Sequence, residues 1–209
     1  MLVSEVINKN FSYDEPILIE DIEKMFPNKS RPWIDKIIST LVKEKHIKRY
    51  ATGIYYIPRT TLFGDSVLNS NKVIERKYLS NNKEVYGYFT GISLLNSLGL
   101  TTQVPNSISI VTNNESSRRR KIVIGNQDIY LIKAPVKITK ENYTVLQLLE
   151  AIKFIDVNDL DEIEKNNLIR YIVENSITLR DISKYCNYFP DFVSKKILGG
   201  KLIELFTQQ

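Results

Sequence analysis

The clearest helical pattern in the sequence runs from Arg31 to Lys45. Its apolar residues recur at the spacing of one face of an α-helix, and they are Ile34, Ile37, Ile38, Leu41 and Val42. Pro32 stands in the first turn, where the N–H that proline lacks would have no helical partner. A helix with a single apolar face needs other elements to cover that face, so the flanking residues are expected to pack against it.

The flanking sequence supplies short elements of the required kind. Two short helical patterns precede the long one, at residues 2–9 and 20–26, with a brief extended stretch between them. After the long helix, two alternating runs enclose the turn Thr52-Gly53 and stop at Pro58, which indicates a β-hairpin. Helix, helix, turn, helix and hairpin, in this order, are typical of a winged helix-turn-helix domain.

A second domain is expected to follow. Residues 62–79 show another helical pattern, whereas the polar residues 80–83 show none. We therefore place the boundary there and predict two domains, residues 1–80 and residues 84–209. A chain of 209 residues is long enough for each of two small domains to bury its own core.

The second domain is predicted to combine helices with a small sheet. Residues 120–124 and 127–132 read as a hairpin around Gly125-Asn126, and residues 107–111 as a further strand. Helices are expected at residues 86–100, 142–154, 159–174, 178–187 and 190–198, with Asp159 and Thr178 as caps. The predicted fold class is α+β: an N-terminal winged helix-turn-helix followed by a mixed helical domain with a small antiparallel sheet.

Basic residues are concentrated in two segments of the chain. The net charge is +5, but residues 24–59 hold nine bases against two acids, and residues 101–140 hold seven bases against two acids. Residues 1–23 and 141–170 have an excess of acids. Two basic segments are the pattern that a polyanion-binding surface requires, although solvated basic faces are also common.

If the long helix enters a major groove, its outward face and the adjoining turn and hairpin carry the DNA contacts. The expected contact residues are Lys29, Ser30, Arg31, Lys36, Ser39, Thr40, Lys43, Lys48 and Arg49. Those at the helix N-terminus are placed for base edges, and those of the hairpin for phosphates. The alternatives are a solvated row of lysines and a winged helix that binds another protein.

Three consecutive arginines, Arg118, Arg119 and Arg120, are predicted to lie in a short connection between strands. They cannot all be buried, because each guanidinium would need its own partner in a low dielectric. We expect them to be unbalanced by nearby acids and to form a basic, nucleic-acid-binding face of the second domain, made of Arg118, Arg119, Arg120, Lys121, Lys133 and Lys137. The alternative is a solvated loop that only aids solubility.

Groups that could converge on a catalytic or metal site are few. With His46 as the only histidine and Cys186 as the only cysteine, a zinc site built on those ligands cannot form. No phosphate-binding glycine loop occurs, and the acids at residues 156–164 straddle a helix start, where they favour the helix dipole. We therefore expect no enzyme activity, no catalytic residue, no metal and no cofactor.

The location of the protein is expected to be the cytoplasm. The N-terminus does not match a signal peptide, and no apolar run reaches the roughly 20 residues that cross a bilayer. One cysteine excludes an internal disulfide and fits a reducing compartment. No membrane contact is predicted.

The middle of the chain carries a family resemblance. The run from Gly87 to Gly91 leads to the segment Leu98-Gly99-Leu100-Thr101-Thr102-Gln103-Val104-Pro105, and a strand, the arginine cluster and a second strand follow. Behind the predicted hairpin that ends in Gly53-Ile54-Tyr55-Tyr56-Ile57-Pro58, this arrangement resembles the AbiEi-type antitoxins of bacterial type IV toxin–antitoxin systems. The similarity spans roughly residues 20 to 155. The family commonly has a glycine after the third helix, where this chain has Lys45-His46.

The resemblance implies an antitoxin that represses its own promoter. Its N-terminal domain would bind repeats in double-stranded operator DNA, as a monomer in solution that can bind cooperatively to adjacent repeats. Its C-terminal domain would counteract a nucleotidyltransferase-like toxin without a stable toxin–antitoxin complex. The basic face around Arg118 would then contact flanking operator DNA or the nucleic acid on which the toxin acts.

Two alternatives stand beside this interpretation, neither with a toxin partner. The first is a stand-alone winged-helix transcription regulator. The second is an RNA-binding protein whose surface aromatic residues, such as Tyr50, Tyr55 or Tyr130, stack on bases.

Overall fold

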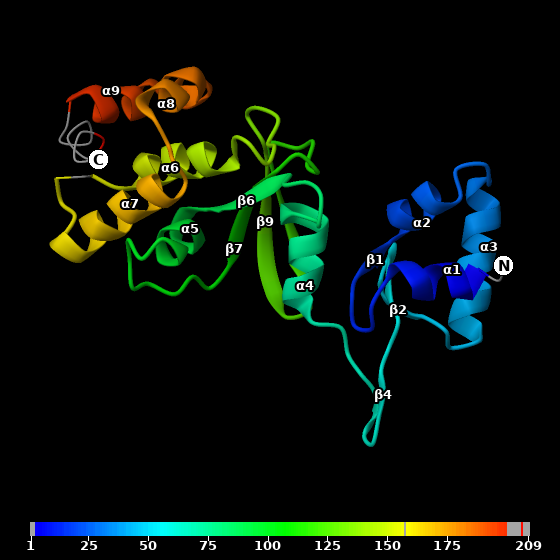
Figure 1. Cartoon of the computed structure of the whole chain (residues 1–209). Coiled ribbons are helices and arrows are strands. Elements are labelled where there is room, and N and C mark those ends of the chain that lie inside the picture. Colours follow the sequence, from blue (N-terminus) through cyan, green and yellow to red (C-terminus); the bar gives the residue numbers. More distant parts are fainter. Residues whose placement is uncertain (1–2, 157, 200–205, 207–209) are drawn as a thin grey trace. The chain divides into compact units, whose positions relative to one another are not determined.

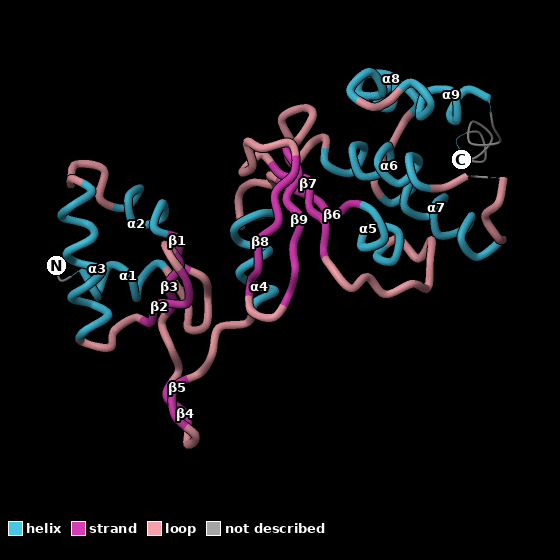
Figure 2. Tube along the Cα trace, turned by 180° about the vertical axis from the view of Figure 1, so that it is seen from behind, coloured by secondary structure: helices cyan, strands magenta, loops and turns pink. Residues whose placement is uncertain are grey.

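The computed structural model describes residues 3–156, 158–199 and 206, and the chain divides into two compact units, Met1–Lys77 and Tyr78–Gln209. The division falls close to the predicted boundary at residues 80–83. Each unit has its own hydrophobic cluster. The protein is of mixed α+β architecture, with small sheets in both units (Figures 1 and 2). In the described part of the chain, no helix has both the length and the apolar character needed to span a membrane.

The first unit begins with three helices and a small antiparallel sheet. The elements are α1 (Val3–Asn10), β1 (Ile17–Leu18), α2 (Ile19–Met25), α3 (Arg31–Lys43), β2 (Lys48–Ala51) and β3 (Ile54–Tyr56). Within the sheet the strand order is β1-β3-β2. The tight turn between β2 and β3 depends on Gly53, whose φ of 73° is in the left-handed region. The predicted order of helices, extended stretch and hairpin is therefore confirmed.

Helix α3 forms for the reasons expected from its sequence. Ile34, Ile38 and Leu41 are buried in the core of the first unit, where Ile7, Ile17, Ile22 and Ile47 join them. The helix ends in a Schellman motif, in which the N–H of His46 donates to the carbonyl of Leu41 at 2.9 Å and the N–H of Lys45 donates to that of Val42 at 3.1 Å. Lys45 consequently takes a φ of 61°, a conformation usually given to glycine.

The helix expected at residues 62–79 is shorter than predicted. Its first part is instead a two-stranded ribbon of β4 (Thr60–Thr61) and β5 (Gly64–Asp65). Helix α4 (Ser70–Ile74) follows, capped by the side chain of Asn69, and runs into a π-helical turn, η1 (Glu75–Leu79). The apolar residues Leu62 and Val67 have the spacing of a helical face, but both are exposed, so their spacing does not reflect packing against a core.

The β4–β5 ribbon protrudes from the first unit but is firmly tied at its base (Figures 1 and 2). Asp14 binds both the guanidinium of Arg59, at 3.1 Å, and the hydroxyl of Ser66. The hydroxyl of Tyr56 donates to the carbonyl of Ser66 at 3.0 Å. At the tip, Leu62 and Phe63 are fully exposed.

The second unit contains a four-stranded sheet. Its strands are β6 (Gly87–Thr90), β7 (Ile108–Thr112), β8 (Arg119–Ile124) and β9 (Gln127–Lys133), in the order β6-β7-β9-β8. The β6–β7 and β8–β9 pairs are antiparallel, whereas β7 and β9 are parallel, so the small sheet differs from the antiparallel prediction in one pair. The parallel pair arises because the chain passes from β7 to the edge strand β8 and only then returns beside β7 as β9.

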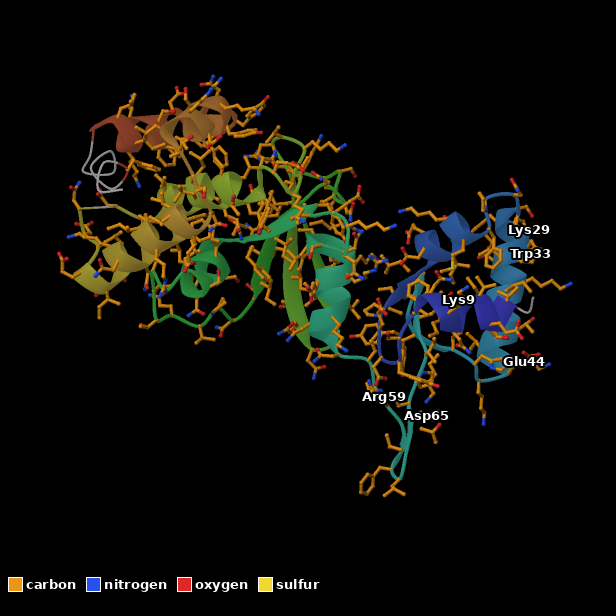
Figure 3. The ribbon with its side chains drawn as sticks, viewed as in Figure 1. Lys9, Lys29, Trp33, Glu44, Arg59 and Asp65 are labelled. Atoms are coloured by element: carbon orange, nitrogen blue, oxygen red, sulfur yellow. The ribbon has the colours of Figure 1, made fainter. Side chains whose placement is uncertain are left out.

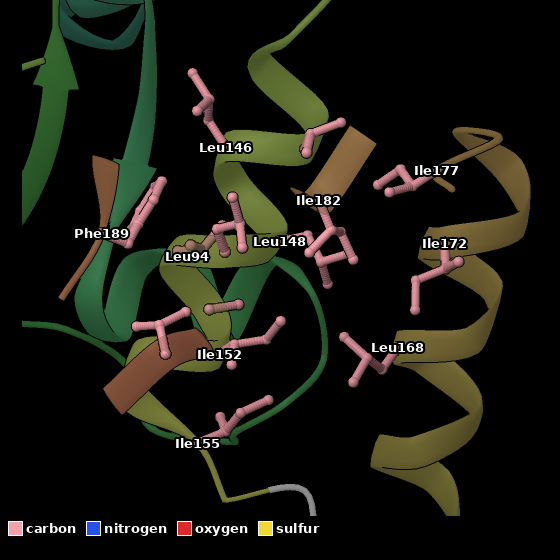
Figure 4. Close-up of a cluster of buried hydrophobic side chains, with 14 of the residues drawn as sticks. Leu94, Leu146, Leu148, Ile152, Ile155, Leu168, Ile172, Ile177, Ile182 and Phe189 are labelled. Carbon is pink, nitrogen blue, oxygen red and sulfur yellow. The ribbon is translucent and has the colours of Figure 1, made fainter. Parts of the chain in front are cut away.

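Helices α5 to α9 gather on one side of this sheet (Figures 1 and 2). They are α5 (Gly91–Ser97), α6 (Tyr143–Phe154), α7 (Glu162–Glu174), α8 (Leu179–Tyr185) and α9 (Asp191–Gly199), with a 3₁₀ turn, η2 (Cys186–Tyr188), after α8. Their shared core is centred on the almost wholly buried α6, with Leu146, Leu148 and Ile152 among the side chains of Figure 4. The single buried acid of that helix among the residues described, Glu150, accepts hydrogen bonds from Thr90 and Lys153.

Two predictions for the second unit need correction. Residues 86–100 do not form one helix, because Gly87–Thr90 is a strand and Gly91, with a φ of 62°, turns the chain into α5. Helix α7 is capped by Asp161 rather than by Asp159. Thr178 caps α8 as expected, with its hydroxyl accepting from the N–H of Asp181 at 3.2 Å.

Candidate nucleic-acid interface

The outward face of α3 is a polar surface along the whole helix. Its exposed residues are Arg31, Pro32, Asp35, Lys36, Ser39, Thr40 and Lys43. They include every residue of α3 that was expected to contact DNA, with Pro32 and Asp35 in addition. Lys36, Ser39 and Lys43 stand at positions i, i+3 and i+7, which places them on one stripe. The two lysines are separated by about 10 Å along the helix axis. Neither lysine makes an ion pair with any residue described in the structure.

The two hydroxyls of this face bond to their own helix. Ser39 donates to the carbonyl of Asp35 at 2.8 Å, and Thr40 donates to the carbonyl of Lys36 at 3.1 Å. This back-bonding uses the hydroxyl hydrogen and leaves the oxygen lone pairs outward. In this arrangement both residues can accept hydrogen bonds from a ligand, while the lysines donate.

Arg31 is held by acids of its own unit. Its guanidinium binds Glu23 of α2 and lies 3.3 Å from the carboxylate of Asp35, one turn further along α3. The hydrogen bond to Glu23 is the main cause that raises the pKa of Arg31. Because two carboxylates balance this charge, Arg31 offers DNA less free positive charge than Lys36 or Lys43 does, which the sequence did not indicate.

The turn before α3 adds a lysine and a hydroxyl. The ammonium of Lys29 lies 5.2 Å from the ring centroid of Trp33, a cation–π contact (Figure 3). Ser30 takes the N-cap position, but its side chain makes no capping hydrogen bond and is exposed. Both polar groups therefore face solvent at the N-terminal end of the helix.

The hairpin contributes less free charge than predicted. The ammonium of Lys48 is 2.9 Å from the carboxylate of Asp65 in the ribbon, and this hydrogen bond raises the pKa of Lys48. Arg49 is exposed and donates to the hydroxyl of Thr52 at 3.3 Å. Of these two, only Arg49 is without an acidic partner among the residues described.

In the second unit, the arginine cluster lies mainly in a strand and not, as predicted, in a loop between strands. Arg119 and Arg120 belong to β8, and Arg118 precedes them. The expectation that no acid balances the cluster is wrong for two members, because Arg120 lies 2.7 Å from Glu115 and Lys121 lies 2.7 Å from Asp128.

Glu115 is the residue of this region that sequence reasoning missed. Its side chain is only 2% exposed. Burial opposes its ionisation, but the N–H of Ser117, at 2.8 Å, and the guanidinium of Arg120 outweigh burial, so the pKa of Glu115 is lowered. The sequence did offer one indication of this ion pair, because Glu115 is the sole acid shortly before the three arginines.

The pleat of the sheet separates the cluster into two sets. Arg119 and Lys121 alternate with Arg120 along β8, so they project from the opposite face of the sheet. On their face stands Tyr130 of β9, which pairs directly with Lys121. The guanidinium carbon of Arg119 is 4.2 Å from the Tyr130 ring centroid, and the ammonium of Lys121 is 6.0 Å from it.

Lys133 and Lys137 are brought together elsewhere, around a shallow cavity of about 390 Å³. This cavity lies beyond the carboxyl ends of the parallel strands β7 and β9, and Glu115 also lines it. The six predicted basic residues therefore do not form one continuous face: Arg119 and Lys121 flank Tyr130, whereas Arg120 meets Glu115 near the two lysines.

The residues considered for metal or nucleophilic chemistry belong to different units. His46 is exposed after α3, and the half-buried Cys186 packs against the core of the second unit. Within the ranges described, no group of three or more His, Cys, Asp or Glu side chains is arranged to hold a metal ion.

Comparison with known proteins identifies a family. No curated protein matches the chain. Residues 15–178 match the model of DUF6088, which is described as a family of unknown function. The match covers most of the first unit and continues in the second to the cap of α8. Because it spans well over half of the sequence, the chain belongs to the DUF6088 family.

Proposed function

We propose that the first unit is a winged helix-turn-helix that binds double-stranded DNA through α3. Three features support the proposal: the element order, the strand order β1-β3-β2, and a long third helix with one buried and one exposed face. A helix presented in this way can lie in a major groove. The β2–β3 turn is short, so it supplies a small wing.

The observation that carries the proposal is the stripe of Lys36, Ser39 and Lys43. The lysines are exposed and have no ion pair among the described residues, although acids neutralise the nearby Arg31. Unpaired lysines gain most from phosphate, because they lose no other partner and release counterions from the DNA. The hydroxyl of Ser39 between them can accept a hydrogen bond from a base.

We further propose that the protein is a cytoplasmic antitoxin that represses its own promoter and counteracts a nucleotidyltransferase-like toxin through its second unit. The support for this role is the resemblance of residues 20 to 155 to AbiEi-type antitoxins. The second candidate is a winged-helix regulator without a toxin partner, which the same DNA-binding surface would serve equally well.

Two experiments test these proposals in turn. Binding of the full chain to DNA from upstream of its own coding region, measured by mobility shift, tests the DNA-binding role. Co-expression with the product of an adjacent nucleotidyltransferase gene tests the antitoxin role. Restored growth supports an antitoxin. DNA binding without any effect on growth supports the regulator.

A further inference from the structure

The exposed face of the β8–β9 strand pair has the chemistry of a stacking platform. Alternate residues of β8 on this face are Arg119, Lys121 and Val123, and opposite them on β9 stand Ile132, Tyr130 and Asp128. Val123 is 62% exposed, and Arg119 and Lys121 are also exposed, so the β8 side of this face is open to solvent. On the β9 side, Ile132 is half-buried against the core of the second unit. From Arg119 to Val123 the strand spans about 13 Å.

The centre of the face is the pair Arg119–Tyr130. The guanidinium lies over the ring at 4.2 Å, and Arg119 forms no ion pair with the residues described in the structure. Lys121, by contrast, is balanced by Asp128 at 2.7 Å. The ring thus holds a flat, unneutralised cation in place, with its outer side open to solvent.

We infer that this Arg119–Tyr130 face binds a short stretch of single-stranded RNA. Unstacked bases pack on aromatic rings and on guanidinium planes, and arginine adds a donor for phosphate. RNA is the nucleic acid whose single-stranded stretches persist without unwinding. This inference concerns the second unit only and does not depend on DNA binding by α3.

The geometry disfavours duplex DNA as the ligand of this face. A two-stranded β-ribbon can enter a major groove, but β9 is an inner strand paired with β7, so the β8–β9 pair is not a free ribbon. The bases of a duplex are already stacked on one another, so they have no free face to stack on the Arg119–Tyr130 pair. A duplex would therefore contact only the positive charges of this face, through its phosphates.

The test is a titration of the full chain against a 5′-fluorescein-labelled RNA 10-mer of mixed sequence, followed by fluorescence anisotropy. Arg119→Lys keeps the charge and removes the planar group. Tyr130→Leu removes the ring. Each is expected to weaken RNA binding by about 5- to 100-fold, the range for losing one stacking partner. A 20-base-pair duplex should bind each variant as it binds the parent chain.

Matched controls are available in the same unit. Arg118→Lys makes the same chemical change one residue away, and Tyr188→Leu removes another exposed ring. Both should leave RNA affinity unchanged. Thermal melting by circular dichroism checks that each variant is folded. If Tyr130→Leu proves unstable, the RNA affinity of Arg119→Lys alone decides the test.

Four results would overturn the inference. The first is unaltered RNA affinity in Arg119→Lys. The second is an equal loss in Arg118→Lys, which would mean that charge alone matters. The third is an equal loss of duplex binding. RNA binding that disappears only when Lys36 and Lys43 are replaced would place the RNA on α3 instead, and it would contradict this inference without touching the proposal for DNA.

Discussion

Gly87 of β6 lies so close to the backbone carbonyl of Tyr78 that a β-carbon built on Gly87 would be 1.9 Å from the carbonyl oxygen. The same β-carbon would also be 3.0 Å from the carbonyl oxygen of Val111. Since backbone atoms surround the site, no flexible side chain can move aside. Gly87 is therefore required for the backbone of Tyr78 to pack against β6 within the second unit.

Gly87→Ala should lower the free energy of unfolding by about 2–3 kcal/mol, as overpacking of a tight site does. Gly64→Ala is the control, because Gly64 has a φ of 103° but open space around its α-carbon. That substitution adds only backbone strain, about 1–2 kcal/mol. Denaturant melts measure both. If Gly87→Ala lowers the free energy of unfolding less than Gly64→Ala does, the close approach of Gly87 to the Tyr78 carbonyl is contradicted.

The hydroxyl of Tyr88 is buried and has no hydrogen-bond partner among the described residues. Burial, and then the nearby charge of Glu150, raises its pKa. Removing an unsatisfied hydroxyl while keeping the ring should be favourable, so Tyr88→Phe is expected to stabilise the fold by about 1 kcal/mol. In a protein of this size the melting temperature should rise by about 2–4 °C.

Tyr171 provides the opposite case. Its hydroxyl contacts the carbonyl of Thr144 at 3.2 Å and the side chain of Gln147 at 2.9 Å. Tyr171→Phe should therefore destabilise the protein by about 1 kcal/mol. Equal effects of the two substitutions on melting would show that Tyr88 is not the unsatisfied residue we describe.

Lys45 holds a left-handed conformation at the end of α3, with a φ of 61°. Glycine adopts this conformation without a steric cost, so Lys45→Gly should stabilise the first unit by about 0.5–1 kcal/mol. Lys43→Gly, within the last turn of the helix, should instead cost about 1 kcal/mol. Melting of the two variants checks the sign of each effect, and destabilisation by Lys45→Gly would rule out the Schellman motif.

Glu115 makes the stability of the second unit depend on pH. Its pKa is lowered in the folded state, so its contribution is complete above its ordinary value of 4.5 and is lost as the pH falls through the folded value. At pH 7, Glu115→Gln should cost about 2 kcal/mol, since hydrogen bonds to a charged group are lost. The difference between variant and parent should shrink towards pH 3, and a difference that is constant with pH would contradict this role.

The sequence predicted the elements whose apolar residues face a core. The periodicity of α3 marks a side that is indeed buried. The helices expected at residues 142–154 and 159–174 are present as α6 and α7, and the Gly125-Asn126 turn correctly joins β8 and β9. It failed where apolar residues are exposed, as at Leu62 and Val67, since an exposed residue mimics a helical face without packing. The strand Gly87–Thr90 was missed because it is short and continuous with a helix.

The candidate interface was predictable only in outline. Helical spacing identified the exposed side of α3, but not which of its charges are neutralised. The tertiary fold brings Glu23 to Arg31 and Asp65 to Lys48, and no local sequence pattern predicts such ion pairs. For the same reason, the division of the arginine cluster between two faces became visible only with the register of β8 and β9.

We propose that Lys36 and Lys43 carry the binding of α3 to duplex DNA. The measurement is the affinity of the full chain for its own upstream DNA as a function of salt, for the parent chain and for Lys36→Ala/Lys43→Ala. A control with the same loss of charge is Lys9→Ala/Lys83→Ala, both exposed and outside α3. We predict that the α3 variant binds more weakly by at least about 1 kcal/mol, and that the slope of log affinity against log salt falls by about 2. The control should match the parent chain. An α3 variant with intact fold, unchanged affinity and unchanged salt slope would show that these two lysines do not bind DNA.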